Sequence, residues 1–212
     1  VRQIADVEID DKISFVIKKT EEIMEDSEYQ GVRLSLDAYL DKTRIPLKID
    51  ISTGDVITPC EISFSYQLMF ENRTIPLLAY PPETVLAEKL ETILSRGEAN
   101  TRLRDFYDVY ILQREDFVVT PDALRYALLA TCRKRGHEDL LHTYASILDR
   151  VRQSDTMRTQ WMKYQSDFDY AAGITWDTVL DTVETLCMKT LDDHAFGDEL
   201  PQEESQFEMH LL

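Results

Sequence analysis

The sequence has little glycine, few cysteines and no long apolar run. Six glycines and seven prolines among 212 residues exclude collagen-like and low-complexity chains. No apolar run approaches the roughly 18–20 residues that a membrane helix needs. The first residues also lack the basic and then apolar pattern of a signal peptide. We therefore expect a soluble, cytoplasmic protein that has no membrane partner.

Cysteine and histidine are too scattered to suggest a metal site. The three cysteines (Cys60, Cys132 and Cys187) lie far apart and are odd in number, and none forms a Cys-x-x-Cys pair. The four histidines form no HExxH-like pair. A zinc site or a disulfide framework is not expected. We interpret the cysteines as three buried thiols in a reducing compartment.

Positive charge is scarce. The chain has 23 Lys and Arg against 40 Asp and Glu, for a net charge of −17. Such a balance disfavours a general polyanion-binding surface, and we expect no DNA partner. Residues 192–208 hold seven acidic residues and no basic ones, so they supply −7 of the −17. The rest of the chain is only moderately acidic, which leaves room for a local basic pocket.

Period-two alternation dominates the first 80 residues. Apolar and polar side chains alternate over residues 34–41 and again over 45–52, which predicts a hairpin with one buried face around a Lys42-Thr43 turn. Shorter strands are expected at 13–19, 60–66 and 74–80. Beyond Pro82 the pattern becomes helical. Helices are expected at residues 83–95, 102–114, 120–136, 142–152 and 155–168, and after Thr175.

This order predicts an α+β fold. We expect a β-rich lobe at residues 1–80, a helical lobe at 81–191 and a flexible acidic tail at 192–212. Residues 1–7 are expected to be the tail of a helix.

Asp50 stands out within the hairpin. With a Lys42-Thr43 turn, Asp37 opposes Lys48, whereas Asp50 opposes Ser35 and has no cation across the strand. A carboxylate without a partner on a strand can present oxygen to a hard cation such as Mg²⁺. A solvated sheet face explains the same pattern and remains open.

Lys89 breaks the pattern of the helix at residues 83–95. At 100° per residue it falls inside the apolar stripe that contains Val85 and Ile93. A lysine at such a position extends to solvent, pairs with an acid or meets an anionic ligand.

The helix at residues 102–114 is apolar nearly all round, so we expect it to be largely buried. Asp108 can pair with Arg104 at i, i+4. Asp105 in this helix and Lys89 in the preceding one suggest facing partners in one cleft. Buried unlike charges of this kind often mark functional sites, although structural ion pairs look the same.

Three segments carry a family resemblance. They are Leu47-Lys-Ile-Asp-Ile-Ser-Thr-Gly-Asp, Glu83-Thr-Val-Leu-Ala-Glu-Lys-Leu-Glu-Thr-Ile and Arg102-Leu-Arg-Asp-Phe-Tyr-Asp-Val-Tyr. Together, from about Glu28 to Leu112, they resemble the AbiEii/AbiGii toxin family of nucleotidyltransferases, whose fold is similar to that of polymerase-β-type enzymes. The resemblance implies a nucleotidyltransferase-like mixed sheet followed by a helical lobe.

The resemblance also implies an activity and its residues. Such enzymes use Mg²⁺ to transfer a nucleotide from an NTP to an acceptor, here an RNA such as tRNA, and they act with a cognate antitoxin in abortive infection and phage defence. By resemblance, Asp50 is the third metal-binding carboxylate, Lys89 meets the triphosphate and Asp105 is the essential acid. Arg104 replaces the central lysine of an RxKDxYD-like motif and, with Asp108, is expected to bind nucleotide.

One family motif is missing. The family has a Gly-Gly/Ser turn followed by an Asp-x-Asp strand, but no two glycines here are adjacent and no Asp-x-Asp strand precedes the hairpin. Residues 9–11 are interpreted as a turn. We therefore expect a fragment that begins just after the metal-binding strand, lacks two of three metal ligands, binds Mg²⁺–NTP weakly and does not transfer nucleotide.

Two other readings stay open. One is a non-catalytic interaction module derived from the nucleotidyltransferase fold, and the other is a helical scaffold in which Lys89 and Asp105 form a structural pair. A small cationic cleft around Lys89, Arg96, Arg102 and Arg104 would permit an RNA partner without requiring one.

Overall fold

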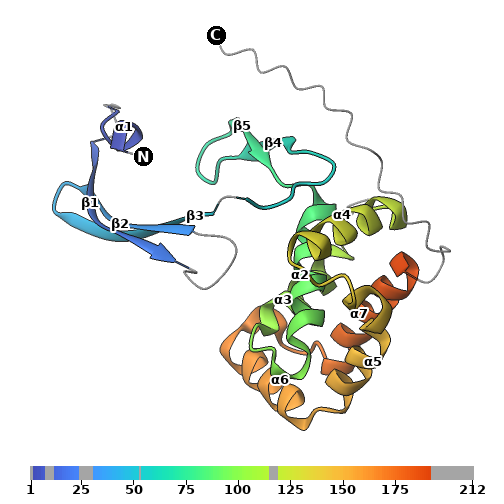
Figure 1. Ribbon diagram of the computed structural model, residues 1–212. Coiled ribbons are helices and arrows are strands. Elements are labelled where there is room, and N and C mark those ends of the chain that lie inside the picture. Colours follow the sequence, from blue (N-terminus) through green and yellow to red (C-terminus); the bar gives the residue numbers. More distant parts are fainter. Residues whose placement is uncertain (1, 8–11, 24–30, 53, 115–118, 192–212) are drawn as a thin grey trace. The chain divides into compact units, whose positions relative to one another are not determined.

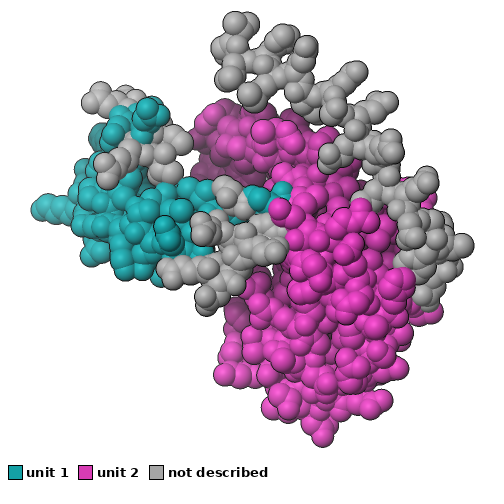
Figure 2. All heavy atoms as spheres, viewed as in Figure 1, with its two compact units in different colours: residues 1–55 teal, residues 56–212 magenta. Residues whose placement is uncertain are grey.

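The computed structural model describes residues 2–7, 12–23, 31–52, 54–114 and 119–191. The chain forms two compact units, residues 1–55 and 56–212, which Figure 2 shows in different colours. Apart from one four-residue helix near the start, the described strands precede the described helices along the chain, so the α+β fold is confirmed (Figure 1). The acidic tail at 192–212 and the turn at residues 9–11 lie outside the described residues. No helix in the described ranges is long and apolar enough to cross a membrane.

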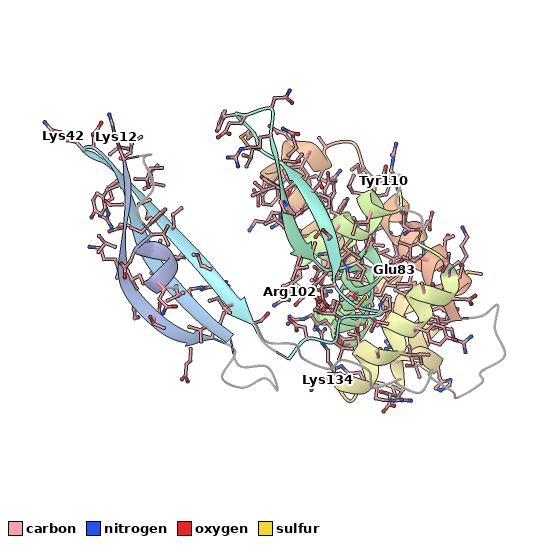
Figure 3. The ribbon with its side chains drawn as sticks, turned by 90° about the horizontal axis from the view of Figure 1, so that it is seen from above. Lys12, Lys42, Glu83, Arg102, Tyr110 and Lys134 are labelled. Carbon is pink, nitrogen blue, oxygen red and sulfur yellow. The ribbon has the colours of Figure 1, made fainter. Side chains whose placement is uncertain are left out.

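Unit 1 is a short helix and a three-stranded sheet. Helix α1 (Arg2–Ala5) precedes β1 (Ile13–Ile23), β2 (Gly31–Leu40) and β3 (Thr43–Ser52). The strands pair antiparallel in the order β1-β2-β3. Lys12, before β1, and Lys42, in the β2–β3 turn, therefore lie at the same end of the sheet (Figure 3).

The predicted hairpin register was wrong by one residue at the turn. Leu40 pairs with Thr43, so the turn is Asp41-Lys42. Asp41 has a φ of 52°, and a positive φ at the first turn residue suits the twist of a hairpin. Aspartate tolerates this region better than most residues. Consequently Asp50 faces Arg33, not Ser35, and Asp37 faces Pro46, not Lys48.

The apolar face of this sheet is buried unevenly. Leu34 and Leu36 of the central strand β2 are buried. On the edge strand β3, the apolar row of Ile45, Leu47, Ile49 and Ile51 is 38–51% exposed. The prediction of a buried face therefore holds for β2 but not for β3.

Unit 2 begins with a second hairpin. Strands β4 (Ile62–Gln67) and β5 (Thr74–Ala79) pair antiparallel. The segment before β4 is bonded to helix α2 (Pro82–Arg96) through Thr84. The Thr84 hydroxyl accepts from Thr58 N–H at 2.9 Å and donates to Thr58 C=O at 3.0 Å. Cys60 in this segment is exposed, so the prediction of three buried thiols was wrong for it, whereas the other two thiols are buried.

The rest of unit 2 is helical, and the change from strand to helix falls between Ala79 and Pro82, as predicted. Helix α2 packs against α3, α4 and α5, and α7 closes the bundle against α3, α4 and α5 (Figure 1). The elements are α2 (Pro82–Arg96), η1 (Gly97–Ala99), α3 (Leu103–Leu112), α4 (Pro121–Lys134), α5 (Leu140–Gln153), α6 (Asp155–Asp167), η2 (Asp169–Ala171) and α7 (Trp176–Leu191).

Local chemistry explains several helix ends. Thr120 caps α4, because its hydroxyl accepts from Ala123 N–H at 3.2 Å. Gly97 ends α2 with a φ of 48°, a backbone conformation that glycine adopts without a steric penalty. Within α2, the side chain of Lys89 points toward α3.

Candidate functional site

Lys89 of α2 is held between two carboxylates of α3. Its Nζ atom lies 3.3 Å from Asp105 Oδ1 and 2.5 Å from Asp108 Oδ2. The exposed fractions of the three side chains are 20%, 15% and 26%, so the cluster is sheltered but still reaches water. Such partial burial strengthens charge interactions relative to those on an open surface.

The sequence places Lys89 here for a simple reason. It shares the helix face that carries Leu86, Leu90 and Ile93, all of which are completely buried in the bundle core. Its aliphatic stem follows this apolar face, and its ammonium group emerges at the edge next to α3. The expectation that Lys89 and Asp105 are facing partners is confirmed.

Asp105 and Asp108 differ in how fully they are bonded. Asp108 was expected to pair with Arg104, but it pairs with Lys89, because a lysine projecting from the packed face of α2 lies closer than the exposed side chain of Arg104. The other oxygen of Asp105, Oδ2, is buried and has no hydrogen-bond partner among the described residues. An unsatisfied buried carboxylate oxygen is costly and points to a missing partner.

Asp50 of β3 has a partner that sequence analysis did not find. Arg33 of β2 bonds both carboxylate oxygens, Nε to Oδ1 and Nη2 to Oδ2, each at 2.7 Å. The bonds from Arg33 hold the pKa of Asp50 below its ordinary value. The prediction of a carboxylate without a cation was therefore wrong, since it depended on the wrong hairpin register.

Asp37 is the buried carboxylate of this sheet. It is 2% exposed and lies 2.9 Å from Arg44 Nε and 3.4 Å from Lys18 Nζ. Burial alone would raise the pKa of Asp37, but the bonds from Arg44 and Lys18 outweigh it and lower the pKa. A cationic partner was predicted for Asp37, although Lys48 is not that partner.

The described residues do not make a magnesium site. No three His, Cys, Asp or Glu side chains within them come together as metal ligands. Both oxygens of Asp50 are already bonded by Arg33, and the carboxylates of Asp105 and Asp108 share the one ammonium group of Lys89. Asp50 belongs to unit 1 and Lys89 to unit 2, each described by itself, so the expected meeting of Asp50 with Lys89 and Asp105 stays a prediction.

A hollow of about 490 Å³ opens beside Asp105 within unit 2. The start of α3 lines one side of it with Asp105, Arg102 and Arg104; Arg102 is labelled in Figure 3. Neither arginine has a side-chain ion pair within the described ranges. Arg96, expected in the same cleft, lines a separate hollow at the end of α2. The predicted cationic cleft is therefore smaller than expected.

The other side of the hollow comes from α6, which sequence analysis did not connect to the site. It contributes Gln160, Lys163, Tyr164 and Phe168. The oxygen Oε1 of Gln160 is a second buried atom without a hydrogen-bond partner in the described part of the chain. The density of aromatic residues between positions 161 and 170 was the signal that could have drawn attention to this segment.

These aromatic side chains form a connected group. Tyr164 packs 4.7 Å from Phe168 and Phe168 5.3 Å from Tyr170, centroid to centroid. Tyr107 of α3 joins them, 4.8 Å from Tyr170. Burial raises the pKa of Tyr164, and its hydroxyl lies 2.9 Å from that of Tyr170. Phe168, which lines the hollow, and Tyr170, which stacks on it, are nonetheless 42% and 50% exposed.

Comparison with known proteins agrees with this arrangement of motifs. Residues 1–182 match the family model described as nucleotidyl transferase AbiEii toxin, type IV TA system. The match covers most of the chain and includes the helices beyond the three motif segments. The chain belongs to the AbiEii nucleotidyltransferase toxin family. No curated protein and no solved structure matches it.

Proposed function

We propose that this chain carries the nucleotide-holding helices of a toxin that transfers a nucleotide from an NTP to an RNA acceptor, with tRNA as one candidate. Its partners would be the NTP, the RNA and a cognate antitoxin protein. The toxin would act in the cytoplasm and would use Mg²⁺ as nucleotidyltransferases in general do. Its role would be defence against phage. Family membership supports the reaction class and the antitoxin, and the finer statements are ours.

The observation that carries the proposal is the sheltered Lys89. Its ammonium group lies at the end of an apolar face, next to an acid that has one oxygen without a hydrogen-bond partner among the described residues. A cation in this setting can neutralise the charge that develops on a departing pyrophosphate. Lys89 would exchange its contact with Asp108 for one with the triphosphate, while its ammonium group keeps the contact with Asp105. Arg104 would add a second charge.

We expect the 212-residue chain itself to transfer no nucleotide. The basis is the sequence, in which no Gly-Gly/Ser turn and no Asp-x-Asp strand precede the β2–β3 hairpin. The test incubates the purified chain with labelled NTPs, magnesium and total RNA, and measures label that becomes acid-insoluble. Label at the level of a protein-free blank is expected. Clear turnover would contradict the inactivity.

The role of Lys89 can be separated from a purely structural one. We expect Lys89→Met to change the free energy of unfolding by less than about 1 kcal/mol, because Asp105 and Asp108 can then be hydrated at the edge of the site. The matched control is Lys189→Met, in an exposed position of α7. Urea unfolding followed by circular dichroism measures both. A loss of about 3 kcal/mol or more for Lys89→Met would identify a structural ion pair.

A second candidate function is a non-catalytic module that binds a partner protein. The observation that favours it is the closed bonding of Asp50 by Arg33 and of Lys89 by two acids. A module of this kind would bind its antitoxin as tightly after Lys89→Met as before, and would gain no stability from NTP. The transferase proposal expects NTP binding to depend on Lys89.

A further inference from the structure

The hollow beside Asp105 contains a group of cations that the protein itself does not neutralise. Arg102, Arg104 and Lys163 line it, and none of them has an ion pair among the residues that the structure describes. Acids outnumber bases 40 to 23 in the chain, and several arginines have acidic partners, as Arg152 has in Asp181 and Glu184. Unpaired cations gathered in an acidic protein indicate an anionic ligand.

The acids near these cations do not cancel them. Asp105 and Asp108 share the single ammonium group of Lys89, so this cluster carries a net charge of −1 beside the hollow. Asp167, the other acid in the lining, is exposed at the end of α6. Three cations against Asp167 and this cluster still leave the hollow with one positive charge in excess. Cations on two different helices suit a chain of phosphates better than a single point charge.

A second observation indicates that the ligand carries bases as well as phosphates. Phe168 lines the same hollow and is 42% exposed although it has no polar group, and Tyr170, which is 50% exposed, stacks on it. Aromatic faces next to a cationic groove are how proteins hold single-stranded nucleic acid, since every base can stack on a ring. Two residues of the lining, Gln160 and Asp105, each have a buried oxygen with no hydrogen-bond partner among the described residues.

We infer that this hollow, formed by the start of α3 and the end of α6, binds the single-stranded end of a polynucleotide acceptor. Lys163 contacts a backbone phosphate, Phe168 stacks on a base, and the chain is led past Asp105 toward the Lys89 cluster. The inference rests on the proposed function only in naming the bound strand as the acceptor of the reaction. The binding of a single strand is inferred from the residues that line the hollow. It separates an acceptor subsite, at Lys163 and Phe168, from the donor contacts of Lys89 and Arg104, the latter at the border of the two.

The test measures binding by the full chain. The probe is a fluorescein-labelled single strand of mixed sequence and about 10 nucleotides, within the site sizes usual for such grooves, titrated at several salt concentrations. One arm uses RNA and the other DNA of the same sequence, which shows which of the two nucleic acids the hollow binds better. In the better arm, we expect Lys163→Ala to weaken binding about fivefold and to reduce the salt slope by about 0.7, the value of one phosphate contact on a single strand.

Phe168 provides an independent readout. We expect Phe168→Leu to weaken binding about tenfold with little change in salt slope, and Phe168→Tyr to restore it, because leucine keeps the apolar volume but has no ring face. The matched controls are Lys189→Ala and Phe70→Leu, whose residues are exposed and do not line the hollow. Circular dichroism confirms that every variant is folded.

Each outcome decides the inference. Loss of single-strand binding in the Lys163 and Phe168 variants, with ATP binding unchanged, supports an acceptor subsite even if the chain transfers no nucleotide. Loss of ATP binding with single-strand binding retained would overturn it, because the hollow would then hold the donor. Absence of measurable binding by the unmodified chain at low salt, or equal binding by variants and controls, would also overturn it.

Discussion

The three-stranded sheet of unit 1 and the helices of unit 2 bury their apolar side chains to very different extents. In the helices, Leu90, Phe106 and Trp161 are no more than 1% exposed. In the sheet, the apolar residues of β3 are 38–51% exposed. Because burial of apolar surface is the main favourable contribution to folding, the helices hold most of the stability of the described chain. The pair of Lys89 and Asp105 belongs to this well-buried part of the chain.

The largest expected effect tests that difference directly. Leu90→Ala should lower the free energy of unfolding by about 3 kcal/mol, because it leaves a cavity in the centre of α2. Ile49→Ala, at an exposed position of β3, should cost less than about 1 kcal/mol. Urea unfolding followed at the helical dichroism band measures both. Equal losses would mean that the sheet is as important to stability as the helices.

Buried charge sharpens the same comparison. Glu91 of α2 is 2% exposed and is bonded by Arg135 and by His137 Nδ1, the latter at 2.7 Å. Glu91→Gln should cost about 2 kcal/mol, since Arg135 and His137 lose the charge of their buried acceptor and Arg135 keeps only the longer ion pair with Glu88, at 3.8 Å. Asp50→Asn, which breaks the exposed pair with Arg33, should have no measurable effect on unfolding. A larger loss of unfolding free energy for Asp50→Asn than for Glu91→Gln would contradict the conclusion that unit 2 holds most of the stability.

Acid should affect the sheet through Asp37. The pKa of Asp37 is lowered from its ordinary value of 3.8 by Arg44 and Lys18. A lowered carboxyl pKa contributes stability that is present above pH 3.8 and is lost as the pH falls through the lower, folded value. Hydrogen exchange of β2 should therefore accelerate below that pH, and Asp37→Asn should remove this part of the acid dependence. An unchanged acid profile in the variant would contradict the assignment.

The smallest effect concerns reactivity and not stability. Cys60 is exposed, while Cys132 is buried with a thiol pKa that burial raises to about 12. A thiol reagent should therefore modify Cys60 rapidly in the native protein, and Cys132 only after denaturation. Mass spectrometry of the labelled peptides measures this. Rapid native labelling of Cys132 would show that the helical core opens readily.

Much of the fold could be predicted from local sequence. The alternation in residues 34–52 and the capping by Thr120 depend on neighbours in the chain, and they located strands and helices closely. The hairpin register could not be predicted in the same way, because Asp41-Lys42 and Lys42-Thr43 are both acceptable turns. That one-residue difference decided the partner of Asp50.

The candidate site was predictable in its centre and not at its edge. Lys89 and Asp105 break the apolar pattern of their helices, so their pairing could be expected. Gln160 and Phe168 break no pattern in α6, and they reach the hollow only through the packing of α6 against α3. Arg135, just after the last turn of α4, bonds Glu91, more than forty positions earlier in the sequence. Contacts between distant segments were the part that periodicity could not supply.

The most direct test of the central claim is NTP binding that depends on Lys89. The thermal unfolding of the unmodified chain, Lys89→Met and Lys189→Met is followed with and without ATP at millimolar concentration, since a ligand that binds only the folded state raises the midpoint. We predict that ATP raises the midpoint of the unmodified chain and of Lys189→Met, and leaves that of Lys89→Met unchanged. Equal shifts in all three proteins, or no shift in any, would contradict the account.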